Sequence, residues 1–413
     1  MNKIKLVVKN KNKKHCNYKI FIMVHKLLSI LFFVIFLISC QSQTSKKIIT
    51  GAERTEKYIP LLKNKKVAIV ANQTSLISHT HIVDSLLAMR INIVKVFSPE
   101  HGFRGNADAG AKVDNYKDSK TGLPLISLYG KSKKPTADIL SDIDIVIFDI
   151  QDVGARFYTY ISTMAYVMEA CAENNIQVII LDRPNPNGHY IDGPVLEKEF
   201  SSFVGMHQVP VVHGMTIGEY AKMVNGEGWL KNGIKCNLKV IKCKNYDHNT
   251  FYQLPVKPSP NLPSMNSIYL YPSLCFFEGT IISIGRGTHY PFEIIGHPDF
   301  TNGDYYFTPK KTPGASLYPP FKNQECNGYF LKDFCIENKM NKIHLKYLIE
   351  MYNFFKNKDD FFNAFFDKLA GTDKLRLQII AGKSEDEIRE SWKAKIDEYK
   401  KIRIKYLLYP DFK

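Results

Sequence analysis

The chain has 413 residues, of which 45% are hydrophobic, and this is enough apolar material for a sizeable core in two domains, so disorder is not expected. The formal net charge is +16, but residues 1–39 hold eight Lys and no Asp or Glu, so the remainder carries 16 − 8 = +8. That remainder shows no basic runs interleaved with aromatic residues, which argues against a nucleic acid as partner.

The N-terminal segment has the features of an export signal. An apolar run from Leu27 to Ile38 follows His25-Lys26 and leads into the sequence Leu37-Ile38-Ser39-Cys40. A Cys directly after such a motif resembles the lipobox of bacterial lipoproteins, in which that Cys is acylated and becomes the first residue of the mature protein. The alternative is an uncleaved anchor helix, although 12 apolar-rich residues are short for a bilayer.

We therefore expect a signal peptide over residues 1–39, with Met23 as the true start, followed by a lipidated Cys40 and a tether that ends at residue 50. Two or three acyl chains hold a protein on a membrane much better than one. The expected location is the cell envelope, facing the periplasm or on the outer membrane.

The region from residue 51 to residue 254 alternates β-branched runs with amphipathic stretches. This alternation predicts βαβ units in a Rossmann-like, doubly wound parallel sheet of the α/β class. Helical spacing of apolar residues occurs over Thr80–Met89 and Tyr160–Glu173, and Asn174-Asn175 is the expected end of the second helix. The predicted strands are Val67–Ala71, Ile93–Phe97, Ile145–Ile150 and Val178–Leu181.

A Pro-rich segment over residues 254–263 marks the predicted domain boundary, and residues 255–413 are expected to form a smaller α+β domain. Residues 264–330 are rich in Gly, Pro and aromatics and predict loops with short strands. A capping box from Ser384 to Glu387 predicts a helix that runs through Trp392 and Tyr399. The segment 406–409 is expected to be a final strand or a packed tail.

The motifs that bind common cofactors are missing from the sequence, so no cofactor is expected. GxGxxG and GxxxxGK[ST] are both absent, and no GxSxG elbow follows a predicted strand. The histidines lack HExxH spacing, and the six cysteines beyond Cys40 contain no CxxC, so a metal site is not expected. The sequence leaves open whether pairs such as Cys236 with Cys243 form a disulfide or remain buried free thiols.

Each predicted strand of the first domain leads into a cluster of polar residues. The carboxyl ends of parallel strands share one edge of a sheet, where ligands of such folds bind. The sequence therefore predicts one cleft lined by these clusters, which are Asn72–Ser75, Ser98–Gly105, Asp149–Arg156 and Asp182–Pro186.

Arginine is rare in this chain, with 47 Lys against 9 Arg, yet four of the nine lie in polar loops: Arg104, Arg156, Arg183 and Arg286. The planar guanidinium suits two-point binding of a carboxylate, which predicts a substrate with an anionic group. At least one of the four is expected to brace a loop by donating to backbone carbonyls.

Eight motifs resemble those of the exo-β-N-acetylmuramidases of peptidoglycan recycling, and the resemblance extends in the same order from Gly51 to Tyr409. It implies a Rossmann-like domain joined to a smaller C-terminal domain, with a pocket between them. It also implies an enzyme that removes N-acetylmuramic acid from non-reducing ends of peptidoglycan fragments. The expected partners are muramyl saccharides. The motifs are Ser98–Gly105, Asp149–Tyr158, Leu181–Pro186, His213–Thr216, Pro258–Asn261, Glu278–Thr280, Gly285–Thr288 and Pro291–Glu293.

Glycoside hydrolysis usually needs one carboxylic acid to protonate the leaving oxygen and a second group that supplies or activates the nucleophile. We predict Glu100 as the general acid, because it follows an inner strand and has Phe103 nearby. For the second group the sequence offers Glu278, Asp152, Asp149 and Glu293. Glu278 is favoured because an interdomain site should draw one residue from each domain. If the acetamido group of the substrate is the nucleophile, Asp152 is expected to polarise it.

The remaining polar residues of these loops are expected to bind substrate, and Arg183 or Arg286 is expected to hold the lactyl carboxylate that distinguishes muramic acid from glucosamine. The predicted substrate-binding set is Asn72, Gln73, His101, Arg104, Asp152, Arg156, Arg183, Asn185, His213, Arg286 and Thr288.

Two other classes of function remain open from the sequence. One is a surface lipoprotein that binds cell-wall sugars without cleaving them. The other is a metal-dependent amidase or esterase that acts on peptidoglycan.

Overall fold

The fold is described from a computed structural model of the chain, which places residues 23, 25–26, 46–100, 102–103, 116–130, 132–337, 340–356 and 360–412. Residues 48–413 form one compact unit, whereas residues 1–47 belong to a separate one. The predicted lipidation site Cys40 lies outside the described residues. Among the helices that are placed, none combines the length and the apolar character needed to cross a bilayer.

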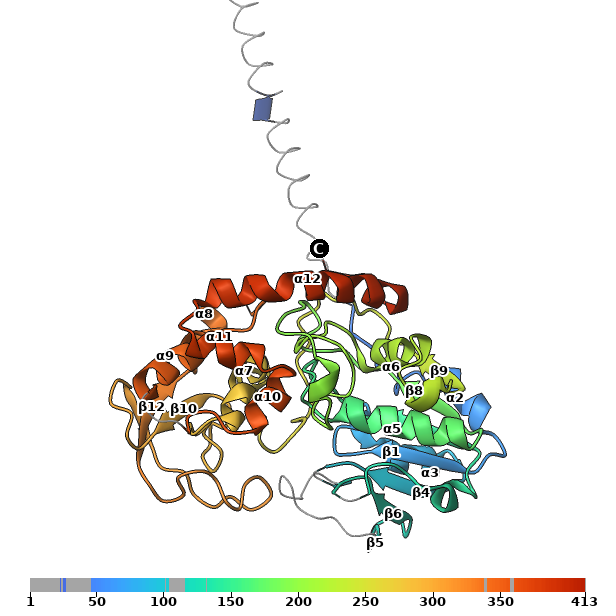
Figure 1. Cartoon of the computed structure of the whole chain (residues 1–413). Coiled ribbons are helices and arrows are strands. Elements are labelled where there is room, and N and C mark those ends of the chain that lie inside the picture. The colour runs from blue at the N-terminus through green and yellow to red at the C-terminus, as the bar shows by residue number, and fades with distance from the viewer. Residues whose placement is uncertain are drawn as a thin grey trace, which may run out of the picture. The chain divides into compact units, whose positions relative to one another are not determined.

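The first domain is built on a seven-stranded sheet in the order β5-β6-β4-β1-β7-β8-β9 (Figure 1). All pairs are parallel except the edge pair of β5 with β6. The six parallel strands thus follow the Rossmann order, with the switch point between β1 and β7. The strands are β1 Val67–Ala71, β4 Ile93–Ser98, β5 Tyr116–Lys117, β6 Pro124–Ser127, β7 Ile145–Asp149, β8 Gln177–Leu181 and β9 Leu238–Ile241.

Successive residues of the inner strands are buried on opposite faces, as expected for continuous Val and Ile runs covered on both sides. In β1, Ala68 and Val70 pack on the side that includes α5 and α6. Val67, Ile69 and Ala71 pack on the side of α2 and α3. The helices of this domain are α2 Thr55–Leu62, α3 Ile82–Ala88, α4 Ala137–Leu140, α5 Tyr160–Glu173 and α6 Ile217–Gly226, and a small hairpin is formed by β2 Leu76–Ile77 and β3 Thr80–His81.

The second domain combines a three-stranded antiparallel sheet, in the order β10-β12-β11, with helices. The sequence prediction of an α/β domain followed by a smaller α+β domain is confirmed. The strands are β10 Ile294–His297, β11 Tyr305–Phe307 and β12 Cys326–Phe330, and the helices are α7 Met265–Leu274, α8 Phe334–Glu337, α9 Lys346–Phe355, α10 Phe365–Ala370, α11 Lys374–Ile380 and α12 Glu385–Arg403.

Helix α12 lies across both domains along the top of the view in Figure 1. Ser384 and Glu387 form the predicted capping box at its start, and Trp392 and Tyr399 are buried along it. The Tyr399 hydroxyl donates to the carbonyl of His213 at 2.7 Å, which ties the helix to the first domain. One continuous apolar cluster runs from the β1 face of the sheet to these α12 side chains.

Several local predictions were wrong or are now settled. Residues 265–274 form helix α7, although they were predicted to belong to loops and short strands. Helix α3 begins at Ile82 and not at Thr80, because Thr80 and His81 pair with β2. Residues 404–406 form a short 3-10 turn, so the C-terminal segment is a packed tail and not a strand. The six cysteines beyond Cys40 are all free thiols.

Candidate active site

A cavity of about 230 Å³ lies between the two domains and is lined by both predicted catalytic glutamates. The first domain contributes loops after β4, β6, β7 and β8, and the second contributes α7, the start of α10 and the chain around Arg286. Its lining residues are Glu100, Tyr129, Phe157, Tyr158, Thr159, Tyr160, Phe203, Val204, Ser259, Asn261, Leu262, Tyr271, Glu278, Arg286, Phe292 and Phe365.

Glu100 follows β4 at the carboxyl edge of the sheet and is half-buried. The Tyr129 hydroxyl, from the loop after β6, donates a hydrogen bond to the Glu100 carboxylate. Burial and the nearby Glu100 charge raise the pKa of Tyr129 above its ordinary value, so this phenol remains a donor at neutral pH. A fixed neutral donor therefore orients Glu100 in the cavity.

Glu278 and Arg286 form an ion pair in the wall of the second domain. The Arg286 Nε donates to Glu278 Oε1 at 2.8 Å, and Nη2 contacts the same oxygen. Burial lowers and the Glu278 carboxylate raises the pKa of Arg286, with a net rise, so the guanidinium stays charged. Its neighbours Gly285 and Gly287 have φ angles of 75° and 83°, which favour glycine and explain the Gly-Arg-Gly sequence of this turn.

Aromatic side chains form much of the rest of the cavity wall. Tyr158 and Tyr160 meet edge to face with ring centroids 4.8 Å apart. The Tyr158 hydroxyl donates to the carbonyl of Pro258 at 2.8 Å, which fixes the interdomain linker to this wall. Tyr271 of α7 packs edge to face on Phe292 at 5.0 Å. The cavity thus offers apolar surface with a few polar groups, as is usual for a small-molecule site.

Arg183 does not line this cavity. It is buried and makes a two-point ion pair with Asp149, with Nε to Oδ1 at 2.7 Å and Nη2 to Oδ2 at 2.8 Å. Its Nη2 also donates to the carbonyl of Leu76 at 3.0 Å. Both residues therefore brace the ends of β7 and β8, and the geometry does not support Arg183 as the ligand of a substrate carboxylate.

Arg156 is also a brace, as was expected of at least one arginine. It is fully buried. Its two terminal nitrogens donate to the carbonyls of Pro194, Val209, Leu369 and Ala370 at 2.7 to 2.9 Å. Burial lowers its pKa to about 9. These bonds join the two domains and leave no terminal nitrogen for a sugar.

Other predicted ligands fix loops of the sheet edge. Asn72 Oδ1 accepts from the Thr74 hydroxyl at 2.6 Å. Gln73 Nε2 donates to the carbonyl of Pro258 at 3.1 Å and so holds the linker that carries Ser259 and Asn261. Asn185 Nδ2 donates to the carbonyl of Met215 at 2.9 Å. These three residues shape the cleft from outside the cavity lining.

Asp152 and His213 lie close together but are both buried outside the cavity lining. The distance from His213 Nε2 to Asp152 Oδ2 is 3.7 Å, and Oδ2 accepts from the Gly154 N–H at 2.7 Å. Thr288 donates to the carbonyl of Gly285 at 2.7 Å and so shapes the Arg286 turn.

Glu293, the fourth candidate for the second catalytic group, is engaged elsewhere. It accepts from the Ser264 hydroxyl at 2.6 Å and from Asn266 Nδ2 at 2.8 Å. It therefore fixes the start of α7. The predicted ligands His101 and Arg104 lie outside the described residues.

The sequence predictions missed the aromatic lining, because they were based on clusters of polar residues. A signal was present in Phe157-Tyr158-Thr159-Tyr160, which directly follows the Asp149–Arg156 cluster. Four aromatic or hydroxyl side chains at the carboxyl end of a strand suit a sugar pocket. Tyr129 carried no comparable signal, because it follows a short strand that was not predicted.

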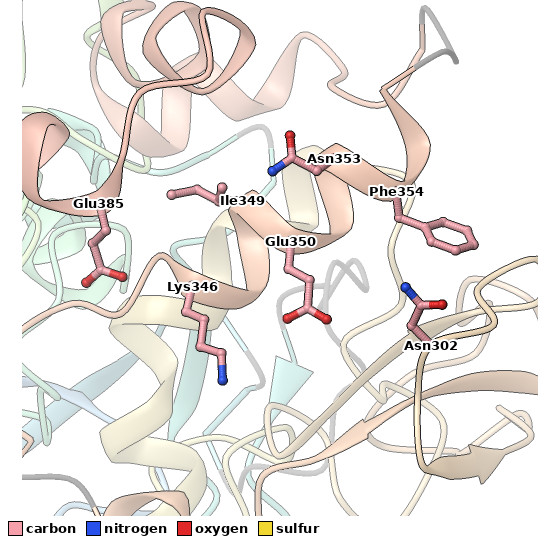
Figure 2. A pocket seen from close by; sticks show the side chains of 7 residues that line it. All are labelled: Asn302, Lys346, Ile349, Glu350, Asn353, Phe354 and Glu385. Carbon is pink, nitrogen blue, oxygen red and sulfur yellow. The ribbon is translucent and has the colours of Figure 1, made fainter.

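A second hollow lies on helix α9 and is lined by Asn302, Lys346, Ile349, Glu350, Asn353, Phe354 and Glu385 (Figure 2). Its carboxylates already have partners, since Glu350 accepts from the Tyr329 hydroxyl and Glu385 accepts from the Leu345 N–H at 3.2 Å. It contains none of the predicted site residues. Across the described residues, no three or more His, Cys, Asp or Glu side chains gather as a metal site would require.

Models of the family exo-beta-N-acetylmuramidase NamZ match the chain in two parts, the N-terminal model over residues 67–266 and the C-terminal model over residues 269–409. The peptidoglycan beta-N-acetylmuramidase NamZ of Bacillus subtilis (strain 168) is 40% identical over 396 residues, which cover 89% of this chain and 94% of that relative.

Two crystal structures of DUF1343 family proteins from Bacteroides fragilis NCTC 9343 have a similar fold. One has a TM-score of 0.82 and 50% identity, over 89% of this chain and 100% of that protein. The other has a TM-score of 0.77 and 32% identity, over 88% and 99%.

Proposed function

Because the chain belongs to the exo-beta-N-acetylmuramidase NamZ family and is a glycoside hydrolase, we propose that it releases N-acetylmuramic acid from non-reducing ends of peptidoglycan fragments. The observation that carries this proposal is that Glu100 and Glu278, one from each domain, line the same interdomain cavity. Most glycoside hydrolases use two carboxylates in different surroundings.

In this proposal the two glutamates have different roles. Glu100 donates its proton to the glycosidic oxygen as the bond to the leaving sugar breaks. Glu278 carries a negative charge balanced by Arg286 and acts on the opposite side of the sugar, where it attacks the anomeric carbon or activates a water. Supporting this division, Arg286 contacts Glu278 directly, whereas a neutral phenol donates to Glu100.

Two arginines, Arg183 and Arg286, are candidates to bind the lactyl group. Arg183 is engaged with Asp149, whereas Arg286 lines the cavity. Arg286 uses Nε and Nη2 for Glu278, and among the described residues its Nη1 has no hydrogen-bond acceptor. We assign the lactyl carboxylate to this remaining nitrogen. One arginine then binds the substrate and holds Glu278.

The test is hydrolysis of a chromogenic β-N-acetylmuramide by the soluble form, residues 41–413, and by its Glu100→Gln variant. We expect the variant to lose at least a thousandfold in kcat and to keep measurable binding of the substrate. Glu199→Gln, a change at an exposed glutamate, is the matched control. Full activity of Glu100→Gln would exclude Glu100 as the acid.

The same assay separates the other two classes of function. A sugar-binding protein without catalysis would release no chromophore in the wild-type form. A metal-dependent amidase or esterase would lose its activity in EDTA and would cut acyl bonds instead of the glycosidic bond. We expect EDTA to leave chromophore release unchanged.

We also propose that Cys40 is acylated and anchors the protein in the cell envelope, as the Leu-Ile-Ser-Cys motif suggests. Two or more acyl chains give stable membrane association. Metabolic labelling with a fatty acid should mark the wild-type protein and not Cys40→Ala, and only the wild-type protein should sediment with membranes. A labelled Cys40→Ala variant would contradict the assignment.

A further inference from the structure

The mouth of the cavity is flanked by two aromatic side chains from different domains. Phe365, the first residue of α10, is 37% exposed although it lines the cavity. Phe203 is half-buried, lines the same cavity, and lies in the loop over residues 194–209. Lining residues that remain exposed to solvent lie at the entrance, so these two rings form its rim.

The two rings differ in how they are held. Phe203 stacks on Tyr166 with ring centroids 6.1 Å apart, and Lys133 Nζ lies 4.4 Å from its ring centroid. Within the described part of the chain, no ring or cation packs on Phe365. Phe203 is therefore a fixed wall, and the Phe365 ring is left with apolar surface for a ligand.

Buried Arg156 sets the distance between the two sides of the rim. One terminal nitrogen donates to the carbonyls of Pro194 and Val209 at the ends of the Phe203 loop. The other donates to the carbonyls of Leu369 and Ala370 at the end of α10. A side chain with five rigid donors thus locks together two segments that are far apart in sequence. The rim is built as a unit with the cavity.

The cavity is too small for more than the terminal sugar of a glycan. Its volume of about 230 Å³ is below the range of about 300–1,000 Å³ that is usual for drug-sized ligands. In an exo-acting reaction the leaving saccharide must therefore lie at the entrance, outside Glu100 and Glu278.

We propose that Phe365 and Phe203 form a binding site for the leaving saccharide, whose apolar C–H face packs on the Phe365 ring against the Phe203 wall. This site rests on the proposed function and defines its aglycone specificity. It favours a leaving group with an extended apolar face, such as a pyranose, over a small alcohol.

The test compares Phe365→Ala and Phe203→Ala with Ile380→Ala, a matched control at a side chain that is 48% exposed on α11 outside the cavity. Two quantities are measured: kcat/KM for the β-1,4-linked muramyl–glucosamine disaccharide, and the inhibition constant of free N-acetylmuramic acid. We expect each rim variant to lose about tenfold in kcat/KM, a typical cost of truncating a central aromatic contact. The inhibition constant should stay within about twofold of wild type, because the inner cavity is intact.

The outcomes are separable. Phe365→Tyr keeps the ring and should restore the disaccharide activity that Phe365→Ala loses. The rim site is wrong if both rim variants have the same kcat/KM for the disaccharide as Ile380→Ala. It is also wrong if the inhibition constant of free N-acetylmuramic acid rises by as large a factor as kcat/KM falls. If wild type itself leaves the disaccharide intact, the proposed function fails before the rim is tested.

Discussion

Tyr129 connects a single hydroxyl to the chemistry of Glu100. Replacing Tyr129 by Phe keeps the ring in the cavity wall and removes only the donor. Glu100 becomes a carboxylate as it gives up its proton, and hydrogen bonds to charged groups contribute about 1.5–3 kcal/mol. We therefore expect Tyr129→Phe to lower kcat on the disaccharide about ten- to hundredfold with little change in KM, measured by steady-state kinetics.

Tyr318→Phe is the control for that substitution, because Tyr318 is 87% exposed and is not one of the residues that line the cavity. A phenol that only fills space would give kcat equal to the control. A parallel rise of KM would instead assign the Tyr129 hydroxyl to substrate binding.

Arg286 is predicted to serve both the substrate and Glu278, and Arg286→Lys separates these roles. A lysine keeps one positive charge near Glu278 but cannot offer a second, fork-like donor to the lactyl group. Activity should fall on both muramyl and glucosaminyl substrates, with an additional loss of about tenfold on the muramyl substrate. Rates for the two chromogenic glycosides measure the difference. Equal losses on both would refute the lactyl assignment.

For single residues, the sequence led to the two glutamates that line the cavity. Several residues that were expected to bind substrate lie outside it. Spacing shows which residues reach the carboxyl edge of the sheet, but it does not show which polar groups satisfy each other there. Asp149 and Arg183 pair across neighbouring strands, and Arg156 turns away to four carbonyls. A buried guanidinium must find such partners before it is free for a ligand.

Among the secondary-structure elements, helix α12 begins with a capping box that contributes to stability without touching the active site. The Ser384 hydroxyl accepts from the Glu387 N–H at 3.3 Å, and the Glu387 side chain accepts from the Ser384 N–H at 2.9 Å. We expect Ser384→Ala to lower the free energy of unfolding by about 1 kcal/mol and to leave kcat unchanged. Urea denaturation measures this, with exposed Ser132→Ala as the control. If Ser384→Ala and the control lower the free energy of unfolding equally, the cap does not contribute to stability.

The loop that packs on α6 contains a histidine that should make stability depend on pH. His207 is buried, with Nδ1 3.1 Å from the Tyr220 hydroxyl, and burial lowers its pKa from 6.5 to about 4. Between these two pH values the unfolded chain binds a proton that the folded chain does not. This residue therefore stabilises the fold fully above pH 6.5, and the contribution, up to about 3 kcal/mol, is lost as pH falls toward 4.

Replacing His207 by Gln should flatten the dependence of the unfolding free energy on pH between 4 and 6.5. Urea denaturation at several pH values measures the slope, and exposed His79→Gln is the matched control. An unchanged slope in His207→Gln would mean that other groups produce the pH dependence.

Elements with strong local signals were predicted close to their observed bounds, and elements with weak signals were not. Strand β1 matches because it is a short apolar run rich in Val and Ile, and helix α5 matches because its apolar residues recur at helical spacing. Helix α7 was missed because Pro272 lies inside it and because Ser267, not Glu or Gln, completes its capping box at Ser264. Two aromatic residues and a proline, Tyr269, Tyr271 and Pro272, also lie within four consecutive residues of it, a composition that favours loops.

In the whole molecule, helix α12 connects the second domain to the first. Arg389 pairs with Asp192 at 2.5 Å, and Arg403 Nε donates to the carbonyl of Gly214 at 2.9 Å. Arg156 makes a second connection between the two domains. Because the catalytic glutamates come from different domains, these contacts set their relative position. The sequence predicted two domains but not these interdomain contacts, because contacts between residues that are distant in sequence leave no periodic pattern.

A core shared by both domains predicts that they unfold together. The chain contains two Trp residues, Trp229 in the first domain and Trp392 on α12, and both pack on the same apolar cluster. Trp392→Phe leaves Trp229 as the only Trp, and Trp229→Phe leaves Trp392. In each variant the denaturation midpoint from Trp fluorescence should coincide with that from far-UV circular dichroism, as two-state unfolding requires. A Trp229 transition that is separated from the transition of the secondary structure would show that the domains unfold independently. The interdomain bonds of Arg156 and α12 would then be too weak to fix the position of Glu100 relative to Glu278.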